Sequence, residues 1–292
     1  MRSVRNILIG VFALVFLAAC GGGGGGGDGG LVSGSSYDGN TAKAALTSDN
    51  TENMADSTSL VTGFTYGLDG MLRSSSAGSK VSYYSIAADS VNAFLAGHTN
   101  DGRSAIDTYT GYGSCGGHFT GSGSIDNSTL YVTLTVEFTN YCEGGATFDG
   151  TIGFRGYYDN NDTISHGTLT FGDCDFSNST YHESISGTIA INGDTVTLNV
   201  VYTGYDDIQY KAENLAVTYS SSGYSYSGRV YHGVYGYVDI STPDPLRFNS
   251  YGDIYTGTLV LTGENSGIKI EYPNGTVTLD SDGNGTYDTI LG

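Results

Sequence analysis

Acidic and amide side chains near the end of the chain have the spacing of a calcium-binding loop. The first, third, fifth and ninth positions of such a loop are occupied by Asp280, Asp282, Asn284 and Asp288. Oxygen atoms at these positions can surround one hard cation, and Gly285 at the sixth position allows the turn. Leu291 stands at the twelfth position, where a bidentate acid is usual. The pattern indicates either a calcium site or, as we favour, an ordinary Asp/Asn/Gly turn between two strands.

Tyrosines over residues 230–240 are candidates for a binding surface. If this segment is one strand, its apolar residues share one face, and the other face carries Tyr231, Tyr235 and Tyr237. Flat aromatic rings in a row suit stacking on sugar rings or contact with another protein. The alternative, which we favour, is that tyrosine is simply a good strand former here or that other strands cover this face.

No catalytic constellation stands out among the residue types that usually carry chemistry. The five histidines are scattered, with no His-x-x-x-His pair, and no Gly-x-Ser-x-Gly elbow lies between a strand and a helix. Carboxylates are plentiful, but nothing singles out a pair at glycosidase separation. We therefore expect a protein that is not an enzyme and that needs no cofactor, calcium being the one candidate.

The cysteines beyond Cys20 predict one disulfide. There are three of them, so one is left outside any intramolecular pair. The midpoint between Cys115 and Cys142 falls close to a predicted turn at 126–128, which would bring both to the open end of one hairpin. The pair Cys142 and Cys174 fits its predicted turn less well. We predict the disulfide Cys115–Cys142, worth about 3 kcal/mol, with Cys174 as a buried thiol.

Strands must position these residues, because from residue 107 onward the sequence alternates with a period of two. Apolar residues at every second position over 130–138 are separated by polar ones, and the same alternation recurs over 148–154, 185–191 and 196–200. Only turn residues lie between the segments, so the strands are expected to be antiparallel. The fold class is mainly β, an antiparallel meander of about a dozen strands arranged as a curled sheet, barrel or sandwich. An outer-membrane barrel fits less well, because glycines interrupt the apolar faces.

Two Asn-Gly pairs predict the register of their hairpins. Residues 192–193 and 274–275 are each read as a two-residue loop. The predicted partners are Ile189/Val196, Gly187/Leu198 and Ile185/Val200 around the first loop, and Tyr272/Val277, Ile270/Leu279 and Lys269/Asp280 around the second.

Residues 41–106 give mixed signals. Asp49 followed by Glu52 resembles a capping box, and the apolar residues after it predict a short helix over 49–62. Apolar residues at helical spacing over 91–95, with Gly97 just after them, indicate a second short helix. The pattern over 81–86 fits helix and strand equally.

The first 20 residues resemble a bacterial lipoprotein signal. Arg2 and Arg5 precede an apolar run over 7–19, which is too short to span a bilayer, and small residues stand before Cys20. The resemblance implies that residues 1–19 are removed and that Cys20 is acylated, with palmitate-type chains as the anchor. Gly21 in place of Asp favours the outer membrane, facing the periplasm or the surface. The alternative is an ordinary secretory peptide with a chance cysteine.

Glycine then dominates the chain. Residues 21–27 are all glycine and a Ser/Gly stretch follows, so residues 20–40 are predicted to be a flexible tether with a reach of roughly 25 Å. The predicted organisation is a signal peptide (1–19), the acylated cysteine and tether (20–40), a mixed segment with short helices (41–106) and an antiparallel β domain (107–292).

Several short words in the β domain resemble an uncharacterised family of Gram-negative cell-envelope lipoproteins. They are Cys115-Gly116-Gly117, Asn140-Tyr141-Cys142, Gly236-Tyr237-Val238-Asp239 and the aspartate-rich stretch 280–288. Together with the lipoprotein signal and the polyglycine, the resemblance covers roughly residues 107–292. It implies the cell-envelope location and the all-β fold, and it brings no known activity with it.

The charge of the chain narrows its partners. The formal net charge is −19, and removal of residues 1–19, which contain two arginines and no acid, changes it to −21 (9 minus 30). An acidic surface repels phosphate backbones, so nucleic acid is not an expected partner. We expect a lipid-anchored cell-envelope protein with a structural or protein-interaction β domain, in contact with the membrane and with envelope proteins. The alternative is a glycan-binding module that uses the tyrosines.

Overall fold

The computed structural model describes residues 36–58, 108–126, 128–158, 164–180, 182–249, 254–272 and 274–291. The predicted signal peptide, Cys20, the second helix near 91–95 and the segment 81–86 lie outside these residues. Within them, no helix combines the length and apolar character needed to cross a membrane.

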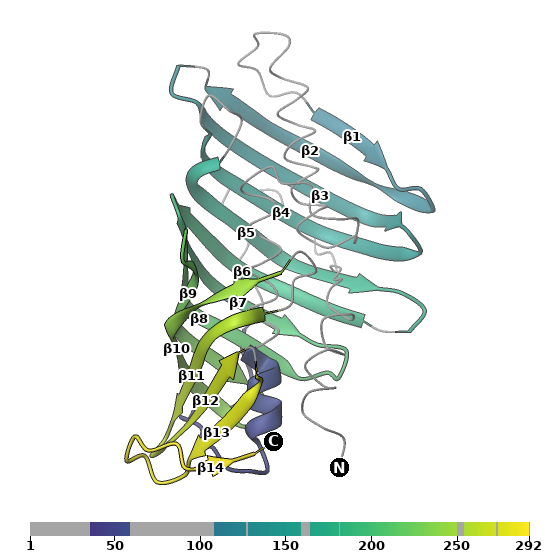
Figure 1. Cartoon of the computed structure of the whole chain (residues 1–292). Helices are drawn as coiled ribbons and strands as arrows, with labels where there is room; N and C mark the ends of the chain where they lie inside the picture. Colours follow the sequence, from purple (N-terminus) through teal and green to yellow (C-terminus); the bar gives the residue numbers. More distant parts are fainter. Residues whose placement is uncertain are drawn as a thin grey trace.

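The described strands form one antiparallel sheet in which each strand pairs with its neighbours in the sequence (Figure 1). The strands are β1 (Thr108–Tyr112), β2 (Gly116–Asp126), β3 (Tyr131–Glu143), β4 (Ala146–Tyr158), β5 (Ile164–Ser177), β6 (His182–Asn192), β7 (Thr195–Thr203), β8 (Gln209–Ser220), β9 (Gly223–His232), β10 (Gly236–Phe248), β11 (Ile254–Gly263), β12 (Ser266–Tyr272), β13 (Thr276–Asp280) and β14 (Thr289–Ile290). The predicted antiparallel meander is confirmed, with 14 strands rather than a dozen. Of the three predicted arrangements, the structure has the curled open sheet (Figure 1).

Alternate residues divide the sheet into two faces, as the period of two predicted. On β3, Val132, Leu134 and Val136 are buried, while Thr135 and Glu137 between them are exposed. We call the side with the buried residues the inner face and the other the outer face. Register shifts interrupt eight of the described strand pairs, for example β3 with β4 and β8 with β9. Such bulges bend strands and increase twist, which is how the sheet curls around its inner face.

The two predicted hairpin registers are wrong by two residues. Around the first loop Ile189 faces Leu198, because the loop consists of Gly193 and Asp194. Gly193 has a φ of 57°, which suits a Gly-X type II′ loop. Around the second loop Ile270 faces Val277. A shift of two keeps each residue on its predicted face, and around the first loop it gives Ile191 an apolar partner.

A segment from outside the meander, residues 36–58, lies across the ends of β9–β12, and we call it the strap. It forms backbone hydrogen bonds with Tyr237, whose N–H donates to Ala42 (2.9 Å) and whose carbonyl accepts from Ala44 (2.8 Å). Further along, Glu264 donates to the Ala44 carbonyl (2.7 Å). Gly236 makes this contact possible, because a Cβ there would lie 2.2 Å from the Ala42 carbonyl oxygen. Residues 37–40, at the end of the predicted tether, are therefore held against the sheet.

The strap ends in a helix over 51–58. Asn50 rather than Asp49 stands at its start, because Met54 donates its N–H to the Asn50 carbonyl (3.0 Å). The Asn50 side chain also accepts from the N–H of Thr47 (2.9 Å). Met54 is fully buried and joins the core formed by the inner face. The predicted helix is confirmed up to residue 58, and residues 59–62 lie outside the described part.

Candidate functional site

The three predicted tyrosines do not share one strand, so that interpretation is wrong. Residues 233–235 form a turn, and β9 and β10 run antiparallel on either side of it. Tyr231 and Tyr237 face each other across this hairpin with ring centroids 5.2 Å apart. Tyr235 lies in the turn. The structure thus brings two of the three together and separates the third.

Tyr231 is enclosed by its neighbours. Only 5% of the residue is exposed, because Tyr37 of the strap packs on it edge to face at 5.4 Å. The Lys211 ammonium lies 4.8 Å from the ring centroid, and the phenol donates to a Glu213 oxygen at 2.8 Å. A ring held in this way presents no open face to a ligand.

Charged side chains surround Tyr237 on the outer face. Together with Tyr231 and its neighbours Lys211 and Glu213, they form what we call the outer-face cluster. The Arg229 guanidinium lies 4.0 Å from the Tyr237 ring centroid and pairs with both Glu213 (3.3 Å) and Asp239 (3.1 Å). Lys43 of the strap adds an ion pair with Asp239 at 2.8 Å. Burial acts to raise the pKa of Asp239, but its bonds to Lys43 and Arg229 outweigh that effect and lower it. The cluster therefore braces the strap against the sheet.

A second polar cluster lies on the inner face, where Tyr202, Tyr210 and His232 occupy one row across β7, β8 and β9. Burial raises the pKa of Tyr202, and the charge of Glu183 and a hydrogen bond to it add to the rise. Burial also raises the pKa of Tyr210, whose phenol donates to Asp206 at 2.8 Å. Both tyrosines are therefore neutral hydrogen-bond donors.

His232 belongs to the same inner-face cluster. The residue is 3% exposed, and burial lowers its pKa, so the imidazole is neutral near pH 7. Its Nδ1 accepts the N–H of Val234 at 3.1 Å, which leaves the proton on Nε2. The Tyr235 ring lies 4.6 Å away and its hydroxyl accepts from Asn53 of the strap helix at 3.0 Å.

Among the acids of the inner-face cluster, Asp56 of the strap helix has the most altered pKa. Burial and the nearby charge of Glu52 raise its pKa to about 6, and its own charge acts on Tyr210. A carboxyl group with a pKa near neutrality beside histidine and tyrosine is the setting in which acid–base chemistry occurs. Here, however, the phenols and the imidazole already bond within the cluster. The arrangement joins the strap to the sheet through Asn53 and Tyr235.

Known proteins give no further guide. Comparisons with protein families, with characterised proteins and with solved structures find no match to this chain. The assignment of function therefore depends on the residues described here.

The predicted calcium loop is a turn that uses its own carboxylates. Asp280 accepts the N–H groups of Gly283 and Gly285, each at 2.8 Å. Asp282 and Asn284 bond to each other and to the adjacent backbone. The Asp288 carboxylate accepts from the hydroxyl of its neighbour Thr289 at 3.3 Å. Among the described residues, no three His, Cys, Asp or Glu side chains converge as a metal site requires.

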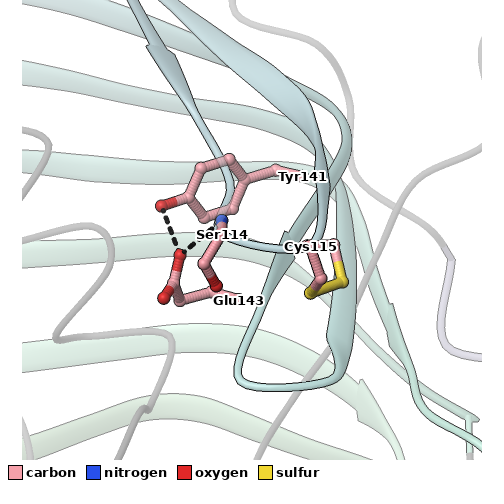
Figure 2. Close-up of a disulfide and its surroundings, with 5 residues drawn as sticks. Ser114, Cys115, Tyr141 and Glu143 are labelled. Carbon is pink, nitrogen blue, oxygen red and sulfur yellow. Dashed lines mark hydrogen bonds between the residues drawn. A yellow bond between two sulfur atoms is a disulfide. The ribbon is translucent and has the colours of Figure 1, made fainter.

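The predicted disulfide is confirmed. Cys115, just before β2, is bonded to Cys142 of β3, with Cα atoms 5.0 Å apart (Figure 2). Beside it, Glu143 accepts from the Ser114 N–H at 3.1 Å and from the Tyr141 phenol at 3.4 Å (Figure 2). The bonds from Ser114 lower the pKa of Glu143. The turn between β1 and β2 is thus fixed to β3 both covalently and electrostatically.

The third cysteine is buried, as predicted. Cys174 is 4% exposed and its thiol donates to the Thr151 carbonyl at 3.3 Å. Its position inside the sheet gives it a packing role.

An exposed aromatic row that the sequence did not single out crosses the outer face. Tyr131, Tyr157 and His166 face one another across β3, β4 and β5. Their ring centroids are 4.9 Å apart in the first pair and 4.7 Å in the second. Tyr157 is 38% exposed. Only the strand register brings these residues together, and no spacing in the sequence points to it.

Proposed function

We propose that this chain is a lipid-anchored protein of the outer membrane whose β domain has a structural or protein-interaction role. The sequence before the domain supports the anchor, because it resembles a lipoprotein signal ending at Cys20. The strap supports the same proposal, since the chain that leads from Cys20 is fastened to β8–β12 from Tyr37 and Asp38 onward. The domain is then suspended from that end of the sheet.

The polar clusters support an interaction role over a catalytic one. In the outer-face cluster, Glu213, Arg229 and Asp239 have altered pKa values because they bond to one another and to Lys43 of the strap. In the inner-face cluster, burial and the bond to Asp206 raise the pKa of Tyr210. Their altered pKa values thus have a structural cause. The same side chains would need other partners to act on a substrate.

The anchor is tested by Cys20→Ala in the full-length protein. We expect loss of fatty-acid analogue incorporation and either an uncleaved precursor or a mislocalised protein, because membrane affinity comes from the acyl chains. Cys174→Ala is the matched control and should keep its label. A Cys20→Ala protein that still took up label and stayed in the outer-membrane fraction would disprove the proposal. Pull-down from solubilised envelopes then tests the interaction role.

Glycan binding is a second candidate, and the row Tyr131, Tyr157 and His166 favours it. Its rings are more exposed than Tyr231 of the predicted set. Retention on immobilised polysaccharide should fall when Tyr157 is changed to Ala, because stacking area is lost. Tyr255→Ala, at another exposed tyrosine, is the control. Equal retention of the two variants would exclude this row, and the triple Ala variant of Tyr231, Tyr235 and Tyr237 tests the original prediction in the same assay.

A further inference from the structure

The two edges of the sheet differ in length and in charge. In the described part of the chain, β1 pairs with β2 alone and β14 with β13 alone. β14 has two residues and follows Asp288 directly, while Asp280 ends the strand beside it. β1 has five residues, Thr-Tyr-Thr-Gly-Tyr, with no charge and no proline. Natural sheets usually protect their edges with charge, proline or shortness. Asp107 directly precedes β1 as Asp288 precedes β14, but β1 is the longer edge strand and has no charge or proline within it.

β1 is also well exposed. Four of its five residues are exposed, and Tyr109 and Tyr112 have 47% and 79% of their surface accessible. An edge strand presents unpaired backbone N–H and C=O groups at every second residue. The backbone and two large side chains of β1 are therefore available to another strand.

The charge distribution indicates which strand could approach. Residues 108–125 contain no Asp or Glu in a chain of net charge −19. Glu137, the nearest acid in the same outer-face row as Thr110, lies two strands from the edge. Two copies joined edge to edge through β1 would hold their Glu137 side chains roughly 24 Å apart, at about 4.8 Å per strand. That separation exceeds the Debye length of about 8 Å at physiological salt. The nearest acids to β1 are Asp107, directly before it, and Glu143, which accepts the Ser114 N–H just after it, so the five central residues themselves present no charge to a second copy.

We propose that β1 pairs antiparallel with β1 of a second copy, about a two-fold axis at Thr110. This register is the one that pairs all five residues. Tyr109 then lies opposite Gly111 of the second copy, on the inner face, where the Phe119 ring of that copy already covers the glycine and can contact the incoming ring. On the outer face, Thr108 lies opposite Tyr112 of the second copy.

Pairing β1 with β14 would engage only two residues and would generate an open chain of molecules, whereas the two-fold pair is closed.

This inference names a second copy of the chain as one partner in the proposed protein-interaction role, and it rests on that proposed function. A five-residue pairing is small beside the roughly 800 Å² per partner that stable interfaces bury. Association in solution is therefore weak, and anchoring of both copies in one membrane raises their effective concentration.

The register is tested by cysteine cross-linking of the full-length protein in native membranes. Thr110→Cys places two thiols across the axis at a separation that a disulfide can bridge. Thr135→Cys is the matched control, an exposed outer-face threonine on β3, which has strands on both sides. We expect a covalent dimer for Thr110→Cys several-fold above the control, with mass mapping to confirm that Cys115–Cys142 is intact. Equal yields would overturn the proposal.

A charge exchange in the Thr110→Cys background separates specific pairing from collision. Thr108→Lys with Tyr112→Lys places like charges opposite each other across the axis, as does the double Glu variant. Each alone should lose the dimer, and the two expressed together should restore it. Failure of the mixture to restore the dimer would overturn the two-fold register.

The test of self-pairing can be separated from the test of the lipid anchor at Cys20. Unanchored Cys20→Ala protein carrying Thr110→Cys should cross-link when it is concentrated, if the edge pairs as proposed. Absence of the dimer in that sample and in membranes would reject self-pairing while the fractionation of Cys20→Ala still decides the anchor.

Discussion

The sheet is completed differently at its two ends. Across β9–β12 the strap adds backbone hydrogen bonds, an ion pair and the buried Met54. At β1–β3 the described chain adds no such cover, and one disulfide fixes the first turn to the third strand. Similar hairpins are thus stabilised by burial under the strap at one end of the sheet and by a disulfide at the other. The difference shows that strand pairing alone does not stabilise the two ends of an open sheet.

The largest expected effect is loss of the disulfide. Cys115→Ala with Cys142→Ala removes a link between residues 27 apart, and we expect a loss of about 3 kcal/mol in the free energy of unfolding. Hydrogen exchange should show lower protection in β1 and β2 and little change in β9–β12. Cys174→Ala measures the effect of removing a buried thiol alone. Uniform loss of protection along the sheet would show that the two ends are not independent.

Met54→Ala is the opposite test, at the strap end. Met54 is fully buried, but its helix has only two turns and should relax around the cavity that the substitution leaves. We therefore expect the free energy of unfolding to fall by about 2 kcal/mol. Protection should fall in the strap and at the adjacent hairpin ends, with β1–β3 unaffected. Asp49→Ala is the control and should change stability little, because Asp49 is exposed and precedes Asn50 at the helix start. A large effect of Asp49→Ala would restore the predicted capping box.

The smallest effect is a pH dependence confined to the strap end. The pKa of Asp56 is raised to about 6, so its contribution to stability is complete below its unfolded pKa of about 3.9 and is lost as pH rises through 6. The contribution of Asp56 to Tm should therefore fall over this range, while Glu213 and Asp239, whose pKa values are lowered, act in the opposite sense. Asp56→Asn should make the slope of Tm against pH more positive than in the unchanged protein. Asp126, whose pKa is lowered to about 2 by bonds from Ser128, titrates mainly below this range. Asp126→Asn should leave the slope unchanged, and an unchanged slope in Asp56→Asn would contradict the assignment.

The sequence predicted the fold because alternation and turn residues are local properties. A buried face made of every second residue requires a strand, and the absence of long connections requires antiparallel neighbours. Register was predicted less well, since alternation fixes which face Ile189 or Ile270 occupies but not its partner. The loop at Gly193 and Asp194 decided the partner through the positive φ of glycine. The edge of the sheet and its curl depend on β-bulges, and the spacing of residues in the sequence does not predict where these bulges lie.

Candidate residues were predictable only where one hairpin brought them together. Cys115 and Cys142 lie on either side of a turn, so counting along the chain located their meeting point. Tyr202 and His232 belong to strands that are neighbours only through β8, and their convergence needs the exact register. The tyrosine interpretation failed at the turn over 233–235. Gly233 within that turn and Gly236 just after it were the available signal, because Gly236 has a φ of 93°.

The strap also bears on the order in which the chain can fold. Each strand finds its partner next to it in the sequence, so the hairpins can form successively with short loop closures. The strap is different, because Leu46 donates its N–H to the Ser266 hydroxyl, a residue 220 positions further along. Its binding site is incomplete until β12 has formed. The first described segment of the chain to be synthesised is therefore among the last to be fully immobilised, and a molecule truncated before β12 would hold the strap only through its contacts with the chain that precedes β12.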